Sequence, residues 1–534
     1  MNETATTQRL AREIGFELPD DYNASRLLFD NLAARADRPA IHCDSGTVTY
    51  AELAEQACRV GNALLTLGCR SGERVLLFME DEPAYPAAIM GAMRAGLVPM
   101  LINTLSTDDL LRFFLEDSGA TAAIISAEHR GLFTPELLDG TACRAVMVTA
   151  TAGDGLLGWD RVESASAELP EAATRPDDMA FWMYSSGSTG RPKGVVHQHA
   201  DAAYSAATYA RHILDIRPDD ICFSVPKIFF AYGFGNSVSF PMSVGAAAVL
   251  MRGRPAPDRI FEQVARHRPT LFFGLPTLYN ALLRDAAADD ADLSSVRRCL
   301  SAAEILSEEI AGGWKRRFGH DLIEGLGSTE MTHIYLANRP ALQKRGSAGR
   351  VVPGYAVKLT DGDGRELPAG EEGVMSVCGL SALREYWQRP DKTAETVRGE
   401  WVYTGDRFIC DEDGYYFFKG RADDLVKVSG QWVYPLEIEL ALAEHPAVNE
   451  CCVMALPLAD QRMTLQAWVV PMPDKSGDAG LTKTLQQFVK DRLLPHKYPR
   501  QVTYLDELPK TGTGKLDRQA LKRTLAGNPE AQAH

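Results

Sequence analysis

The stretch "RVLLFMEDEPAYPAAIMGAMRAGLVPMLI", residues 74–102, decides the fold class. It opens with a short apolar run, 74–79, which is typical of a buried strand. The alanine-rich run over 83–96 predicts a helix that stops at Gly96, since glycine commonly terminates helices. A second apolar run, 97–102, predicts another strand. Strand, helix and strand in this order indicate parallel strands covered by helices, the arrangement of an α/β protein.

The same alternation extends along the chain. A helix is expected over 107–119 and a strand over 121–126, and the pattern returns over 221–330. Beyond residue 350, "GYAVKLTDGDGRELPAGEEGVMSVCG" predicts short strands joined by Asp-Gly turns, and hence a β-rich lobe.

A further change of pattern marks the expected domain boundary. After "GRADD" (420–424), a helix is expected over 435–446, followed by a strand and an amphipathic helix. We therefore expect an N-terminal domain, 1–422, of α/β subdomains plus the β-rich lobe. A small α+β C-terminal domain, 423–534, follows it.

Composition excludes several classes of protein. The chain has 534 residues, 45% hydrophobic and 24% charged, which fits a globular protein with more than one core. Its net charge of −15 argues against nucleic acid or an anionic membrane as the main partner, because both attract clustered positive charge. No apolar run reaches the roughly 18 residues that span a bilayer.

Cysteine usage and the first residues suggest a compartment. The 10 cysteines form no C-x-x-C pair, which argues against a zinc or redox motif and suits a reducing environment. The segment "MNETATTQRLAREIGFELPDD" is polar and acidic and has no apolar signal-peptide core. We expect a cytoplasmic protein.

The stretch "YSSGSTGRPKGVVH", residues 184–197, has the composition of a phosphate-binding loop. Its glycines let backbone N–H groups approach an anion, its hydroxyls add donors, and Lys193 adds a positive charge. It is not a Walker A motif, since the residue five after Gly187 is Pro192 and Lys193 is followed by Gly194. Taken alone, the stretch could equally be an exposed Gly/Ser turn.

Three further segments favour a functional reading. "GLGSTE" (325–330) ends on a hydroxyl and a carboxylate, "YTGD" (403–406) places Asp406 after a turn, and "LPKTGTGK" (508–515) places Lys515 in a glycine-rich loop. In this order, and together with "GRADDLVKVSG", they resemble the acyl-adenylate-forming superfamily. That superfamily includes acyl-CoA synthetases, peptide-synthetase adenylation domains and firefly-type luciferases.

The resemblance covers nearly the whole chain and implies both a fold and a reaction. The implied fold is a large N-terminal domain and a small mobile C-terminal domain. In the implied reaction, a carboxylate attacks the α-phosphate of ATP and gives acyl-AMP and pyrophosphate. A thiol, here that of coenzyme A, then attacks the acyl-AMP and gives a thioester and AMP.

The resemblance also implies residue roles. Thr329 would contact the α-phosphate, Glu330 would hold Mg²⁺, and Lys515 would offset the charge of the transition state. Asp406 and Arg421 would bind the ribose. Singly, Glu330, Asp406 and Lys515 can be read as a helix-start carboxylate, a turn aspartate and a solvated lysine, but their joint pattern favours function. The loop around the β- and γ-phosphates would comprise Ser185, Ser186, Gly187, Ser188, Thr189, Gly190 and Lys193.

Further implied roles concern the C-terminal domain. Asp423 would be the hinge about which that domain rotates between the two steps, and Gly430 would pass close to the CoA pantetheine. Lys515 is also a candidate for an acetyltransferase and a deacetylase, because acetylation would remove the charge that adenylation needs. The sequence leaves open whether the protein is a homo-oligomer.

Two segments, 227–246 and 325–340, resemble the benzoate-CoA ligase branch. Without that resemblance, the Phe-Phe-Ala-Tyr run would read as ordinary core, and His333 as a polar group satisfied within the fold. An aspartate that would meet an amino-acid substrate is missing between Lys227 and Gly245. The implied acyl-pocket residues are Phe230, Ala231, Tyr232, Leu326, Gly327, His333 and Ile334.

Two departures from the family affect the pocket. Many relatives have an aromatic residue at the position of Leu326, and many read "SAGE" where this chain reads "SAAE" (301–304). The methyl group of Ala303 is of a size that typically shifts discrimination by about 1–3 kcal/mol. Benzoate, hydroxybenzoate, aminobenzoate, fluorobenzoate and saturated ring acids therefore all remain open as substrates.

Three other functions share parts of this pattern. A free-standing adenylation enzyme that loads a carrier protein would differ only in the thiol acceptor. A luciferase-like oxygenase would act on an acyl-AMP, but the benzoate-type segments argue against it. A nucleotide-binding regulator without turnover is disfavoured, because it would not need Glu330, Asp406 and Lys515 together.

Overall fold

The computed structural model describes residues 6–185, 191–422, 426–428, 431–457, 463–473, 475–494, 496–510 and 516–526. The chain divides into two compact units. The first comprises Met1–Val357 and Ser376–Tyr403, and the second comprises Lys358–Met375 and Thr404–His534. The expected domain boundary after residue 422 stays a prediction.

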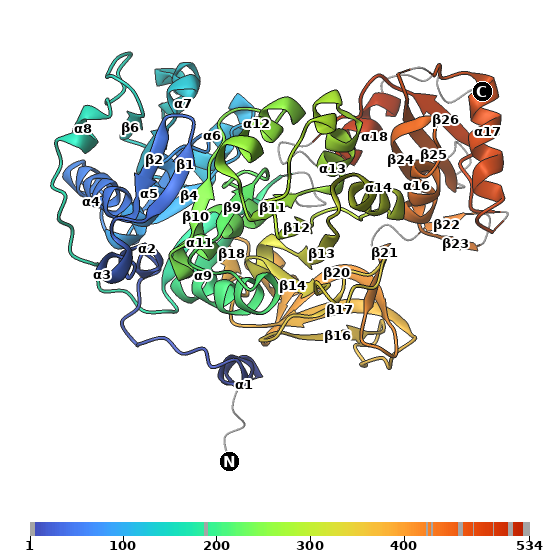
Figure 1. The fold of residues 1–534 in the computed structure, drawn as a ribbon, viewed down its shortest axis with the longest axis horizontal. Helices are drawn as coiled ribbons and strands as arrows, with labels where there is room; N and C mark the ends of the chain where they lie inside the picture. The colour runs from blue at the N-terminus through green and yellow to red at the C-terminus, as the bar shows by residue number, and fades with distance from the viewer. Residues whose placement is uncertain are drawn as a thin grey trace. The chain divides into compact units, whose positions relative to one another are not determined.

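Within the described residues, nine strands form the larger sheet of the first unit, which we call sheet A (Figure 1). Their order is β15-β14-β13-β12-β11-β9-β10-β1-β2. The strands from β13 to β1 run parallel, and β2, β14 and β15 are antiparallel. The strands are β1 (Pro39–Cys43), β2 (Gly46–Thr49), β9 (Ile221–Ser224), β10 (Ala247–Val249), β11 (Leu271–Gly274), β12 (Arg298–Ser301), β13 (Leu322–Gly327), β14 (Ile334–Ala337) and β15 (Arg350–Val351).

A second sheet of the first unit, sheet B, contains the strands of the 74–102 stretch. Among the described residues it has seven strands in the order β18-β8-β7-β4-β3-β5-β6. The expected strand, helix and strand over 74–102 are confirmed, and β3 pairs in parallel with both β4 and β5. The strands are β3 (Arg74–Phe78), β4 (Val98–Leu101), β5 (Ala122–Ile125), β6 (Ala145–Val148), β7 (Met179–Ser185), β8 (Lys193–Gln198) and β18 (Glu385–Tyr386).

Helices complete the first unit. α4 (Tyr50–Thr66) and α5 (Ala84–Arg94) cross so closely that a Cβ on Gly91 would lie 2.2 Å from the carbonyl oxygen of Ala57, so the crossing requires glycine. Two segments are π-helical, Ala206–Leu214 and Gly235–Ser239. The remaining α-helices are α1 (Thr6–Glu13), α2 (Arg26–Phe29), α3 (Leu32–Arg35), α6 (Asp108–Ser118), α7 (Pro135–Leu138), α8 (Asp160–Glu163), α9 (His199–Ser205), α10 (Ala231–Phe234), α11 (Phe240–Val244), α12 (Pro257–His267), α13 (Pro276–Arg284), α14 (Glu308–Phe318) and α15 (Pro390–Thr396). Short 3-10 turns are Ala127–Leu132, Ala286–Asp289 and Thr329–Met331.

The second unit has a core of its own. Val433, Ile438 and Leu485 are fully buried in it, together with residues of a three-stranded sheet in the order β24-β25-β26. The helix and strand expected after residue 434 are confirmed. The elements that lie wholly in this unit are β21 (Tyr416–Arg421), β22 (Val426–Val428), β23 (Gln431–Val433), α16 (Pro435–Ala443), β24 (Val448–Pro457), β25 (Met463–Pro471), α17 (Ala479–Lys490), β26 (Gln501–Tyr504) and α18 (Arg518–Ala526).

The chain passes between the two units within strands. The division falls inside β16 (Ala356–Thr360), β17 (Glu372–Cys378) and β20 (Trp401–Cys410), and β19 (Val397–Arg398) pairs with the start of β20. No helix in the described part of the chain is long and apolar enough to cross a membrane. Each of the 10 cysteines lies within that part as a free thiol.

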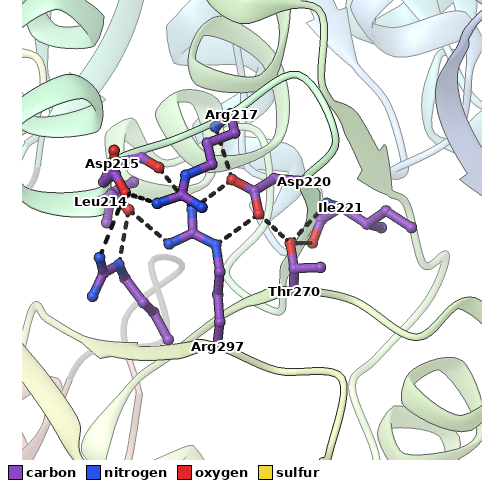
Figure 2. Close-up of polar contacts among 8 residues, drawn as sticks. Leu214, Asp215, Arg217, Asp220, Ile221, Thr270 and Arg297 are labelled. Atoms are coloured by element: carbon purple, nitrogen blue, oxygen red, sulfur yellow. Dashed lines mark hydrogen bonds and ion pairs between the residues drawn. The ribbon is translucent and has the colours of Figure 1, made fainter.

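A polar cluster joins the residues that directly precede β9, β11 and β12, at the amino-terminal ends of these three strands of sheet A (Figure 2). Arg297 donates to both carboxylate oxygens of Asp220, at 2.8 and 2.5 Å, and also to the carbonyl oxygens of Leu214 and Asp215. Thr270 and the backbone N–H of Arg217 complete the partners of Asp220. Burial alone would raise the pKa of Asp220, but these donors hold it below its usual value.

Candidate functional site

The carboxyl ends of the parallel strands of sheet A gather three of the expected site segments at one edge. β9 ends at Ser224, β12 at Ser301 and β13 at Gly327. The 227–246 segment, which we call the acyl segment, follows β9. The "SAAE" segment spans the end of β12, and the "GSTE" turn follows β13. Ligands of open parallel sheets usually bind at this edge, so the placement favours one common site.

The turn after β13 has a tight, strained backbone. A Cβ on Gly327 would lie 2.4 Å from the carbonyl oxygen of His333, so the approach of β13 to β14 requires glycine. Thr332 has a φ of 66°, which a β-branched residue rarely adopts. Such strain concentrates at functional sites, where the surroundings hold it in place.

Glu330 lies at the centre of a polar group built from several strands. Its Oε1 accepts hydrogen bonds from the hydroxyl of Tyr386, at 2.8 Å, and from Ser185 Oγ, at 3.3 Å. Lys193 Nζ lies 4.0 Å from the centroid of the Tyr386 ring. Ser185 and Lys193 face each other as register partners where β7 ends and β8 begins. The structure therefore brings both ends of the expected phosphate loop beside Glu330.

The remainder of that loop, Ser186, Gly187, Ser188, Thr189 and Gly190, lies outside the described residues. The same holds for Lys515, Asp423 and Gly430. Their roles stay predictions.

Thr329 is held through its backbone. Its carbonyl oxygen lies 2.8 Å from Nε2 of His197, the last residue of the 184–197 stretch, for which the sequence indicates no role. His197 Nδ1 lies 2.8 Å from Oδ2 of Asp201. Both side chains are fully buried.

Asp406 and Arg421 lie together in the second unit. They are register partners of β20 and β21, and Arg421 Nη1 donates to Oδ1 of Asp406 at 3.0 Å and to the carbonyl oxygen of Thr404 at 3.1 Å. Gly405 has a φ of 72°, which allows the turn before Asp406. The pair combines a carboxylate acceptor with a guanidinium donor, and both groups can bond to sugar hydroxyls.

The expected acyl segment packs around His333. Its ring centroid lies 5.4 Å from that of Tyr232, 5.3 Å from that of Tyr209 and 4.4 Å from that of Phe240. A Cβ on Gly235 would lie 2.3 Å from the His333 ring, so the contact requires glycine. Tyr209 and Gly235 belong to the two π-helical segments, and π-helical turns are frequent at functional sites.

His333 presents a hydrogen-bond acceptor. Burial lowers the pKa of its imidazole to about 3, so the ring is neutral at neutral pH. Nε2 lies 3.3 Å from the carbonyl oxygen of Tyr232, which only accepts, so Nε2 carries the proton. Nδ1 is then an acceptor, and it is buried without a hydrogen-bond partner among the described residues.

The other expected pocket residues lie in the 227–246 segment or on β13 and β14. Ile334 is buried, and the ring centroids of Phe230 and Phe229 lie 4.6 Å apart. Asp81, which no sequence motif marks, anchors the 227–246 segment, because its Oδ1 accepts the backbone N–H of Ile228 at 3.2 Å. Burial raises the pKa of Asp81 to about 6. The expected residues that are half-buried are Phe230, Ala231, Tyr232, Leu326 and Gly327.

Ala303 occupies a glycine-type position. Its φ is 69°, in the left-handed region that costs a residue with a Cβ about 1 kcal/mol or more. This explains why glycine suits the position in "SAGE" sequences.

Two family profiles match the chain. One, described as "AMP-binding enzyme", matches residues 28–387, and the other, "AMP-binding enzyme C-terminal domain", matches residues 437–515. The chain belongs to the AMP-binding enzyme family. Its membership of the acyl-adenylate-forming superfamily, expected from the sequence, is thereby confirmed.

Curated relatives and solved structures indicate to which branch of the family this AMP-binding enzyme is similar. It is 42% identical to the benzoate–CoA ligase of Thauera aromatica over 510 residues, which cover 95% of this chain and 97% of that one. It is 39% identical to the 4-hydroxybenzoate–CoA/benzoate–CoA ligase of Rhodopseudomonas palustris, covering 96% of each. A crystal structure of an anthranilate CoA ligase in complex with anthranoyl-AMP superposes with a TM-score of 0.90 at 35% identity, covering 96% of this chain and 99% of that one. The similarity to the benzoate-CoA ligase branch and the expected α/β fold are confirmed.

The donor set at Glu330 fits a magnesium ion. Carboxylate and hydroxyl oxygens are hard donors, and Mg²⁺ is often held by one or two carboxylates together with substrate phosphates and water. Within the described ranges, no group of three or more His, Cys, Asp and Glu residues could hold a metal. A cation here would therefore take most of its ligands from outside the protein, as water or phosphate oxygens.

Proposed function

We propose that this enzyme is an ATP-dependent aryl-CoA ligase. It activates a benzoate-type carboxylate as an acyl-AMP and transfers the acyl group to coenzyme A, with release of pyrophosphate and AMP. The observation that carries the proposal is the meeting of Ser185, Lys193 and Glu330 at the edge of sheet A where the aromatic segment around His333 also lies. Similarity over nearly the whole chain to a benzoate–CoA ligase supports it.

In the first step, the residues near Glu330 bind the triphosphate. Lys193 supplies positive charge to the β- and γ-phosphates, and the loop 185–193 supplies hydroxyl and backbone donors. Thr329 contacts the α-phosphate, and Glu330 holds Mg²⁺, which would offset phosphate charge when bound. Lys515 offsets the negative charge that builds as the carboxylate attacks.

The nucleoside and thiol sites involve the second unit. Asp406 accepts from the ribose hydroxyls, with Arg421 beside it. After pyrophosphate leaves, rotation about Asp423 withdraws Lys515 and brings Gly430 to the pantetheine. The acceptor is coenzyme A in this proposal, and carrier-protein loading is the outcome that would replace it.

His333 bears on the choice of acid. Its unpartnered Nδ1 accepts, so a ring with a hydroxyl or amino donor gains a hydrogen bond that a ring fluorine cannot make. We therefore propose a preference for hydroxyl over fluorine at one ring position. A neutral hydrogen bond of about 1 kcal/mol corresponds to roughly 5- to 10-fold in kcat/KM.

The test is pyrophosphate release on a panel of acids, with and without CoA. The panel contains benzoate, the hydroxy-, amino- and fluorobenzoates, and cyclohexanecarboxylate. Multiple turnover with aromatic acids only when CoA is present supports the proposal. Release that stops at one turnover with CoA points instead to a carrier-protein thiol.

A matched variant tests the role of His333. In H333F a phenyl ring replaces the imidazole, and the Nδ1 acceptor is lost. The ratio of kcat/KM for hydroxybenzoate to that for its fluorobenzoate counterpart is therefore expected to fall towards 1. An unchanged ratio in H333F would contradict the role given to Nδ1.

A further inference from the structure

A fully buried histidine–aspartate pair lies behind the turn that carries Thr329 and Glu330. His197 is near the end of β8, and Asp201 is in the first turn of α9, four residues later. Both side chains are completely buried, and the mechanism above uses neither.

The imidazole of His197 joins this part of sheet B to the turn. On one side, Nε2 lies 2.8 Å from the carbonyl oxygen of Thr329. On the other, Nδ1 lies 2.8 Å from Oδ2 of Asp201 and 3.1 Å from Oγ1 of Thr332. Two residues of the turn are thus held by one ring.

The hydrogen-bond partners determine where the protons lie. A carbonyl oxygen only accepts, so Nε2 carries a proton and donates it to Thr329. The single hydroxyl proton of Thr332 goes to the carbonyl oxygen of Ser381, at 2.9 Å, so it is not available to His197 Nδ1. A proton therefore lies between His197 Nδ1 and Oδ2 of Asp201. Whether this proton is bonded to the nitrogen or to the oxygen, Nε2 keeps its own proton.

Asp201 is itself fixed in orientation. Its Oδ2 also accepts the backbone N–H of Gln198 at 3.0 Å, whereas its Oδ1 has no hydrogen-bond partner among the described residues. An asparagine at this position would keep its carbonyl oxygen at the Oδ2 place, because an amide N–H₂ there would face the N–H of Gln198. His197 would then have to carry its proton on Nδ1, and Nε2 would turn a lone pair towards the carbonyl oxygen of Thr329.

We propose that His197 and Asp201 are positioning residues for adenylation. Asp201 selects the protonated form of Nε2, and Nε2 holds the carbonyl of Thr329, so that Thr329 and Glu330 keep the direction needed at the phosphates. The turn needs such a tie because Thr332 has a φ of 66°, a strained conformation that would relax if released. The proposal rests on the adenylation function given above.

The test compares two single variants with their double variant. D201N has the same shape as wild type but removes the Nε2 donor, and we expect about a 100-fold loss in kcat for adenylation, with little change in KM for the acid. H197Q loses the ring but keeps an amide N–H₂ that can reach the carbonyl of Thr329, so its loss is expected to stay within about 5-fold. The double variant H197Q/D201N is expected to match H197Q, which would rescue D201N.

Packing alone predicts the opposite order, since removing a buried ring should harm more than exchanging an oxygen for N–H₂. H199Q is the matched control, because His199 is buried nearby and its Nδ1 accepts from the backbone N–H of Ala24 without contact to Thr329. Melting temperatures of all variants separate folding from positioning.

Failure of the proposed function can be distinguished from failure of the positioning role. If wild type releases no pyrophosphate with any aromatic acid, the proposed function fails. If wild type is active and folded D201N stays within about 3-fold of it, or is no worse than H197Q, the positioning role is overturned.

Discussion

Sheet A has one edge at the amino-terminal ends of its parallel strands and another at their carboxyl-terminal ends. The two edges differ in how their polar side chains are hydrogen-bonded. At the amino-terminal edge, Arg297 and Asp220 are bonded to each other and to the backbone around them (Figure 2). At the carboxyl-terminal edge, Ser301 Oγ, Ser328 Oγ and His333 Nδ1 are buried without a hydrogen-bond partner among the described residues. Arg297 and Ser301 are only four residues apart in sequence.

Left-handed backbone occurs near both edges, since Asp215 and Arg268, close to the amino-terminal edge, have φ values of 50° and 48°. Thr332 and Ala303, both near the carboxyl-terminal edge, have left-handed φ values of 66° and 69°. Buried polar groups without a partner cost stability, and a bound ligand is one way to satisfy them. The amino-terminal edge therefore stabilises the fold, and the carboxyl-terminal edge has the unpartnered polar groups expected of a ligand site.

The largest expected effect is on activity at the carboxyl-terminal edge. E330Q keeps the size of the side chain and its bonds from Tyr386 and Ser185 but removes the negative charge on which the proposed Mg²⁺ site depends. We expect adenylation to fall by about 100- to 1,000-fold, while the melting temperature changes little. Pyrophosphate release and thermal unfolding measure the two quantities. Equal loss of activity and stability would contradict the division between the edges.

The next effect is on stability at the amino-terminal edge. R297A leaves the buried carboxylate of Asp220 without its main partner, so the free energy of unfolding should fall by about 3 kcal/mol, with the kcat of the folded protein unchanged. R268A is the matched control, since the ion pair of Arg268 with Asp292 is exposed and worth about 0–1 kcal/mol. Urea unfolding measures both. Similar losses in R297A and R268A would show that burial of the pair does not matter.

The pH dependence of stability tests the neutral histidine. The pKa of His333 is lowered to about 3 in the folded protein, whereas the unfolded imidazole takes up a proton below about pH 6.5. The unfolded state therefore binds more protons in this window, and stability falls as pH decreases through it, by about 1.4 kcal/mol per pH unit from this residue. H333F should lose this increment in urea unfolding between pH 6.5 and 5. An identical pH slope in the variant would show that His333 is not the group responsible.

The smallest expected effect comes from relieving backbone strain. A303G removes the Cβ from a residue with a φ of 69° and should raise the free energy of unfolding by about 1 kcal/mol. G319A is the converse control, because Gly319 has a φ of 79° and open space around its Cβ position, so it should lose a similar amount. A loss of stability in A303G would mean that the methyl group of Ala303 contributes more than the strain costs.

The sequence predicted the elements better than the contacts between them. The apolar runs over 74–79 and 121–126 are strands because short buried strands need little beyond their own residues. The bond from Tyr386 to Glu330 joins residues 56 positions apart, and no local pattern indicates it. The two π-helical segments also have no sequence signal, since their residues suit an α-helix equally well.

Parts of the site were readable for a different reason. Ser185, Lys193 and Glu330 could be expected at one site because the order of their motifs resembles that of a known family. The structure joins Ser185 to Glu330 by a hydrogen bond and pairs Ser185 with Lys193. His197 was in the quoted stretch, but its partner carbonyl lies 132 residues away, so its role depends on tertiary structure. The left-handed φ of Ala303 was signalled only by the departure from "SAGE".

The most direct test of the proposed adenylation site is a single-turnover experiment. Enzyme in excess is mixed with ATP and a hydroxybenzoate without CoA, quenched, and analysed for aryl-AMP, and CoA is then added to a second sample. We predict one equivalent of aryl-AMP per limiting ATP in the first sample and its conversion to aryl-CoA and AMP in the second. ATP that stays intact, or is cleaved to ADP, would contradict the assignment of this edge of sheet A to carboxylate adenylation.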